Sequence, residues 1–248
     1  MKKLVCFVLV IMLTMSLSLV AAADSNTEAY ELYRIAEAKM ENKSVEILGV
    51  MEMTMSIGED VTVETTTNFT SKALQNSKGE IEMSTAGTIE ALGEQYKFEQ
   101  YFKDGFLYQN VMGEKMKSEM PALDASRGVM LESQIPREFF NDAVVEEVEG
   151  GKRIRVSLSG DYMEELVMSA VDAASLGELD NVKFGRTTLW ITVGDDGAMK
   201  EMAMVYRMST EVEGVTMQIR AATNMHIVSV GQVRSISFPS DLASYKAA

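Results

Sequence analysis

Methionine is unusually frequent in this chain, and some of the methionines recur at alternate positions. The 248 residues include 20 methionines, and Met51, Met53 and Met55 alternate with polar residues. Thioether side chains are flexible and polarisable, so they fill irregular apolar space and line adaptable binding surfaces. Because alternate residues of a strand share a face, this spacing predicts a strand with three inward methionines. That face is either an ordinary core or the wall of a cavity for an apolar ligand.

The same three thioethers are also candidate ligands for a soft metal ion. Thioethers two residues apart can converge on Cu(I) or Ag(I), provided that the strand is exposed. The sequence has one cysteine, Cys6, and one histidine, His226, so other soft ligands are scarce. We therefore predict no metal and no cofactor, and keep a methionine-based Cu(I) or Ag(I) site as a minor alternative.

Catalytic groups are equally scarce. A single cysteine and a single histidine exclude disulfide bonds and most pairings of a nucleophile with an imidazole. The neighbours Glu146 and Glu147 point to opposite faces of a predicted strand, and Asp195-Asp196-Gly197 is typical of a turn. The sequence therefore predicts a protein that is not an enzyme. Its net charge of −14 at pH 7 also argues against a nucleic-acid partner.

The first 23 residues resemble a signal peptide. Met1 to Lys3 are basic at two of three positions, Leu4 to Val20 are almost entirely apolar, and Ala21 to Ala23 supply small residues for cleavage after Ala23. Cys6 stands at the start of the apolar run rather than directly after the cleavage site, so we do not expect a lipoprotein. We predict a secreted protein, extracellular or periplasmic, with an uncleaved membrane anchor as the alternative.

The remaining chain, residues 24–248, is predicted to be one domain dominated by strands. Apolar residues recur at helical spacing over residues 26–41, and alternation with a period of two follows from Met51 onward. A different segment lies between Pro121 and Pro136 and is expected to hold short helices. A further helix is expected from Asp161, as its cap, to Ser175, with a stop at Gly177.

The last two predicted strands allow their register to be worked out. A two-residue turn at Glu213-Gly214 pairs Val212 with Val215. The apolar face then carries Met202, Met204, Tyr206 and Met208 opposite Met225, Thr223, Ala221 and Ile219. Arg207 faces Arg220 on the other, solvated face, where His226 also lies. About ten strands joined by tight turns predict an α+β fold, in which one long, strongly curved antiparallel sheet forms an incomplete β-barrel and helices cover its concave face.

The candidate residues for lining a ligand cavity are the inward apolar side chains of these elements. They are Met51, Met53, Met55, Met83, Phe98, Met130, Met163, Trp190, Met202, Met204 and Met208. At Trp190 the pattern is compatible with a core position or with a cavity wall.

The order of the elements resembles the LolA-like superfamily, which includes lipoprotein carriers and mycobacterial lipid binders, and especially its uncharacterised secreted relatives in Gram-positive bacteria. The residues that carry the resemblance are Ser44-Val45-Glu46 after the first helix, the hairpin from Tyr101 to Tyr108, the segment from Leu189 to Met199, and Phe238-Pro239. The resemblance implies an incomplete β-barrel with an apolar cavity for lipid or lipoprotein acyl chains. The alternative function is an envelope or extracellular domain with a packed core that binds another protein.

Overall fold

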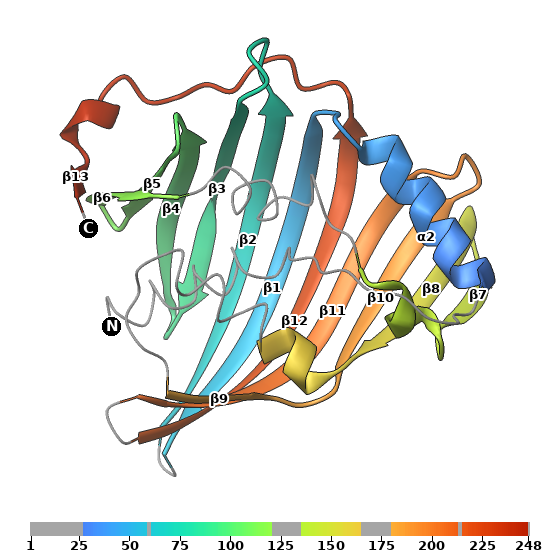
Figure 1. The fold of residues 1–248 in the computed structure, drawn as a ribbon. Helices are drawn as coiled ribbons and strands as arrows, with labels where there is room; N and C mark the ends of the chain where they lie inside the picture. Colours follow the sequence, from blue (N-terminus) through green and yellow to red (C-terminus); the bar gives the residue numbers. More distant parts are fainter. Residues whose placement is uncertain (1–26, 59–60, 121–134, 165–179, 213–214, 248) are drawn as a thin grey trace.

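The protein is built around one large, open sheet. The computed structural model describes residues 27–58, 61–120, 135–164, 180–212 and 215–247. Within them the strands join into a single 13-stranded sheet that is strongly curved (Figure 1) and whose two edges, β7 and β13, are not paired with each other. The predicted fold class, a curved antiparallel sheet that stays an incomplete barrel, is therefore confirmed.

The elements and their bounds follow the chain in this order: α2 (Thr27–Met40), β1 (Val45–Ile57), β2 (Val61–Gln75), β3 (Ile81–Ala91), β4 (Glu94–Lys103), β5 (Phe106–Val111), β6 (Glu114–Glu119), η1 (Arg137–Phe140), β7 (Val144–Val148), β8 (Gly151–Leu158), β9 (Asp180–Phe184), β10 (Thr187–Gly194), β11 (Met199–Val212), β12 (Val215–Val230), η2 (Leu242–Ser244) and β13 (Lys246–Ala247). The strand order across the sheet is β13-β6-β5-β4-β3-β2-β1-β12-β11-β10-β8-β7, and β9 pairs with β11.

The alternation predicted from the sequence gives the sheet two distinct faces. On β1, Met51, Met53 and Met55 are buried, whereas Leu48 and Val50 on the opposite face are 48% and 41% exposed. We call the face that carries these methionines the inner face and the other one the outer face. Because the helix α2 also packs into the methionine cluster, the inner face is the covered one.

The predicted register of the last hairpin is confirmed. Val212 pairs with Val215, and the ladder continues through the Met208–Ile219 and Met202–Met225 pairs. A two-residue turn leaves no freedom to slip the register, so the alternation of each strand then sorts its side chains onto one face or the other.

The predicted first helix is confirmed as α2, which lies over the β7 to β11 end of the sheet (Figure 1). Its apolar positions Ala29, Tyr33, Ala36 and Met40 are buried. The Tyr33 ring stacks on Phe140 of η1, with centroids 5.1 Å apart. These contacts hold α2 against the inner face.

Three predicted segments differ from the structure or lie outside the residues that it describes. Residues 160–164 are helical, but the cap is Ser159 rather than Asp161: its Oγ accepts a hydrogen bond of 3.2 Å from the backbone N–H of Tyr162. A serine hydroxyl three residues before that N–H has the geometry of an N-cap, so the helix begins earlier than predicted. The rest of that helix, the segment 121–134 and the predicted signal peptide lie outside the described residues.

The end of the chain takes a path that the sequence did not predict. After β12 it crosses to the far edge of the sheet (Figure 1), where β13 pairs in parallel with β6. Phe238 packs on Tyr101 with ring centroids 6.1 Å apart, and Tyr245 packs edge-on against Tyr108 at 5.6 Å. The C-terminal segment thus covers the outer face of β4 and β5.

In the parts of the chain that the structure describes, no helix combines the length and the apolar character needed to cross a bilayer.

Candidate functional site

The inner face is a continuous apolar surface with methionine as its characteristic residue. Thirteen of the 20 methionines belong to one cluster of buried side chains: Met40, Met51, Met53, Met55, Met83, Met120, Met163, Met199, Met202, Met204, Met208, Met217 and Met225. The structure therefore brings together, in one cluster against the inner face, residues that are up to 185 positions apart in the sequence.

Most of the predicted cavity residues lie in this cluster, which we call the methionine face. These are Met51, Met53, Met55, Met83, Met163, Met202, Met204 and Met208. Whether they line a ligand cavity stays a prediction. Phe98 is also buried, but it belongs to a separate small cluster with Ile89 and Val111, and Phe69 packs against both clusters. Met130 lies outside the described residues.

Trp190 lies on the opposite face of the sheet from the other predicted cavity residues that the structure describes. Its neighbours Leu189 and Ile191 are buried on the inner face, so alternation turns Trp190 to the outer face. There its strand neighbours are Arg155 and Ala203. A residue on that side of the sheet cannot line a cavity on the methionine face.

The burial of the three candidate methionines is unfavourable for the alternative of a Cu(I) or Ag(I) site. Met51, Met53 and Met55 are only 1%, 2% and 0% exposed, whereas such a site requires an accessible strand. Among the described residues, no group of three or more histidine, cysteine or carboxylate side chains is placed to hold a metal ion.

The methionine face also contains hydroxyl groups that have no hydrogen-bond partner. They belong to Thr65 and Thr67 on β2, Thr187 on β10 and Tyr206 on β11, all of which are at most 4% exposed. Burial raises the pKa of the Tyr206 phenol, so the group stays protonated and remains a donor. Sequence reasoning missed these residues as a set, although polar residues at inward positions of a strand were the available signal.

No fully buried side chain on the inner face carries a charge within the described part of the chain. None of the buried polar side chains is charged; all are threonine, serine or glutamine. The basic residues of the β11–β12 pair, Arg207 and Arg220, are exposed on the outer face. An anionic group on the inner face would therefore find no buried cation to neutralise it.

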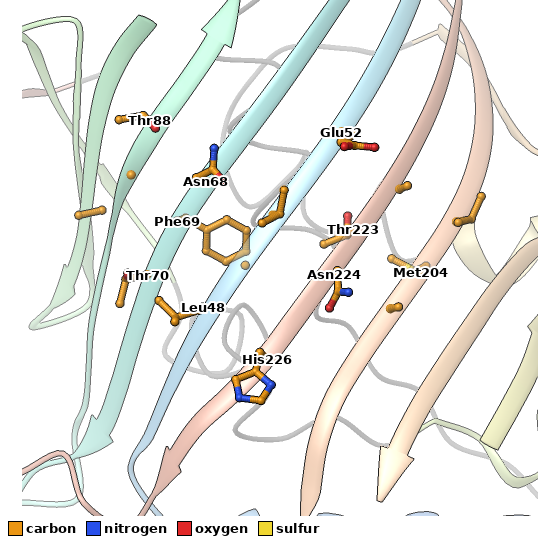
Figure 2. Close-up of a pocket in the computed structure, with 17 residues that line it drawn as sticks. Leu48, Glu52, Asn68, Phe69, Thr70, Thr88, Met204, Thr223, Asn224 and His226 are labelled. Atoms are coloured by element: carbon orange, nitrogen blue, oxygen red, sulfur yellow. The ribbon is translucent and has the colours of Figure 1, made fainter. Parts of the chain in front are cut away.

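The outer face carries a shallow groove of about 820 Å³ across β3, β2, β1, β12 and β11. Figure 2 shows its lining, with Leu48, Asn68, Thr88, Asn224 and His226 on adjacent strands. The prediction that His226 faces solvent is confirmed.

The lining of this groove also includes residues that alternate in phase with the inner-face side chains of their strands, and two of these residues are glycines. A Cβ atom on Gly49 would lie 2.0 Å from the ring of Phe69, and one on Gly87 would lie 2.1 Å from the carbonyl oxygen of Asn68. At Gly87 a side chain would collide with the backbone of the neighbouring strand, whereas at Gly49 it would collide with the ring of Phe69.

Comparisons with known proteins find one matching family model and several similar solved structures. A family of unknown function, DUF6612, matches residues 27–246. No curated protein matches the chain. The structure of LprF from Mycobacterium bovis is 12% identical, covers 88% of this chain and 99% of its own, and has a TM-score of 0.38.

A LolA superfamily protein from Nitrosomonas europaea is also among the matching structures. It is 9% identical, covers 88% of this chain and 99% of its own, and has a TM-score of 0.29.

Proposed function

Because the chain belongs to DUF6612, a family of unknown function, its role has to come from its own geometry, and we propose that it is a non-enzymatic binding protein for lipidic ligands. The methionine face is the binding wall. Its ligands in this proposal are acyl chains of lipids or lipoproteins, and the protein acts outside the cytoplasm.

The observation that carries the proposal is the composition of a single face of an open sheet. The cluster on the inner face is uncharged, and methionine is supplied to it by β1, β3, β11 and β12 as well as by α2. Unbranched thioether side chains can change rotamer at little cost, so a wall made of them can repack around chains of different length and unsaturation. Branched aliphatic side chains such as valine or isoleucine have fewer rotamers and would adapt less.

The expected export and the expected lack of catalysis support this proposal from the sequence. A signal peptide cleaved after Ala23 would deliver a carrier to a compartment where lipids have to cross water. A carrier needs an apolar wall and no reactive groups, which agrees with a sequence that has a single histidine and a single cysteine.

The test uses two neighbouring alanines that point to opposite faces. Ala221 is 0% exposed on the inner face, and Ala222 lies in the groove of the outer face. We expect Ala221→Leu to block binding of a pyrene-labelled alkane, because the added side chain fills the space over the methionine face. Ala222→Leu should leave binding unchanged. Equal binding by both variants would contradict the proposal.

A second measurement does not depend on the folding of a variant. Native mass spectrometry of the unaltered protein, purified from its own host, should reveal a co-purifying lipid. Protein that is free of lipid and that also fails to bind the alkane would show that the methionine face is only a core.

One observation favours the alternative function, binding of another protein. The groove of the outer face exposes Leu48 and Val50 to solvent. The two functions use opposite faces of the sheet, so Val50→Thr should leave alkane binding intact if the methionine face is the binding wall. A loss of alkane binding in this variant would place the ligand on the outer face instead.

A further inference from the structure

The unpaired hydroxyl groups of the methionine face are arranged in register across the sheet. The Met53–Thr65, Met53–Ala221 and Tyr206–Ala221 pairs join β2, β1, β12 and β11 into one row. This row has a hydroxyl group at each end and an apolar middle.

Thr187 extends the row by one strand. The ladder that pairs Thr188 with Val205 puts Thr187 beside Tyr206, and both side chains are turned to the inner face. Directly opposed residues of neighbouring strands have Cβ atoms about 5 Å apart, so the two hydroxyl-bearing side chains are close neighbours. Thr67 lies two residues from Thr65 on the same face of β2.

The middle of the row carries a small side chain. Ala221 is the smallest side chain of the row and separates Tyr206 from Met53. The distance from β11 to β2 is three strand spacings, about 14 Å. A ligand that lies along the row would therefore meet hydroxyl groups at both ends and methyl groups between them.

A buried hydroxyl group without a partner is unfavourable, and native structures seldom keep several of them close together. Tyrosine and threonine hydroxyls can each donate one hydrogen bond. Ester and amide carbonyl oxygens accept such bonds and carry no net charge. A carboxylate or phosphate would accept them too, but it would have to be buried without a cation, which is far more costly.

From this arrangement we infer that Thr187 and Tyr206 form a polar subsite that binds an uncharged ester or amide group of an acyl lipid, with Thr65 and Thr67 as a second such subsite at the other end of the row. The inference rests on the proposed function and narrows its ligands: acyl chains joined through a neutral carbonyl group are preferred to free fatty-acid anions. The methionines around the subsite hold the chains, and the hydroxyl groups set where along the ligand the protein binds.

The test compares two probes that differ in the carbonyl group. A pyrene-labelled diacylglycerol and a pyrene-labelled alkane of equal chain length are titrated against the unaltered protein, Tyr206→Phe and Thr187→Val. Each substitution removes a hydroxyl group and keeps the shape of the side chain. We expect both variants to bind the diacylglycerol about three- to tenfold more weakly, which corresponds to one hydrogen bond, and to bind the alkane unchanged.

The matched control is Tyr101→Phe, the same chemical change on the outer face of β4, which should affect neither probe. Both inner-face variants should melt at the same temperature as the unaltered protein or higher, because an unpaired hydroxyl group is removed. Equal weakening for both probes, or no weakening for the diacylglycerol, would overturn the subsite while leaving the proposed function in place. An unaltered protein that binds neither probe would overturn the proposed function itself.

Discussion

The ring of Phe69 occupies the space that Gly49 leaves open on the neighbouring strand. The two residues are paired between β2 and β1, and a Cβ atom on Gly49 would come within 2.0 Å of the Cζ atom of the ring. Phe69 in turn packs against the methionine face and against the small cluster of Ile89, Phe98 and Val111. The missing side chain at position 49 thus lets one aromatic ring join the two parts of the core.

This contact predicts that Gly49→Ala displaces the ring and destabilises the protein by about 1 to 3 kcal/mol, as overpacking of a core does. Urea unfolding measures the loss. In a Phe69→Leu background the same substitution should cost much less, because the atoms that collide are gone. An equal cost in both backgrounds would show that the backbone of β1, and not the ring, needs glycine.

The register of the β11–β12 hairpin predicts that the same substitution has very different effects at two positions three residues apart. Met204 is 5% exposed on the inner face, whereas Arg207 is exposed on the outer one. Met204→Asp buries an unpaired charge and should lower the free energy of unfolding by several kcal/mol; Arg207→Asp should change it by less than about 1 kcal/mol. Similar melting temperatures for the two variants would contradict the register.

The C-terminal segment is predicted to stabilise the edge of the sheet through Tyr245. This side chain is 7% exposed, packs on Tyr108 and lies beneath the ammonium group of Lys115 at 5.6 Å. Tyr245→Ala should cost about 2 kcal/mol or more, whereas Tyr245→Phe should cost little. Without the anchor, β13 should leave β6 as an open edge, and size-exclusion chromatography should then detect association of the Ala variant.

The partly buried carboxyl of Glu37 on α2 should make the stability of the protein depend on pH. Burial is the largest effect and raises the pKa of its carboxyl above the usual 4.5, against the opposing influence of Arg34 and of the Tyr33 hydroxyl, which donates to it at 3.1 Å. The folded protein therefore binds this proton more tightly than the unfolded chain, so stability is lost as the pH rises from the unfolded pKa through the folded one.

Glu37→Gln keeps an acceptor for Tyr33 and removes the buried charge. It should raise the melting temperature at pH 7, and the gain should vanish below about pH 4, where the carboxyl is protonated in both states. Glu31→Gln, at an exposed position on the same helix, is the control for the change in net charge. A lower melting temperature of Glu37→Gln at pH 7 would mean that the ion pair with Arg34 outweighs the cost of burial.

Part of this architecture followed from the sequence because it depends on local periodicity. The helix α2 and the hairpin of β11 and β12 have unambiguous spacing and, for the hairpin, a turn that permits one register. Local spacing is therefore enough to assign inward positions to Met202, Met204 and Met208. The same reasoning assigns His226 to the solvated face.

Other features depend on contacts between residues far apart in the chain. Trp190 was ambiguous because aromatic residues suit both faces of a strand, and its pairing with Arg155 and Ala203 decided the outer one. The return of the C-terminal segment to β6 has no local signal, since it is held by ring contacts such as that between Phe238 and Tyr101.

The row of hydroxyl groups shows most clearly what sequence alone could not decide. Thr65, Thr187 and Tyr206 are each unremarkable in a strand, where threonine and tyrosine are common. They form a set only because the pairing of β2, β1, β12, β11 and β10 brings them into one row, and because the covered inner face keeps them out of contact with solvent. Periodicity determines which face a side chain takes, whereas strand order and register determine which side chains it meets there.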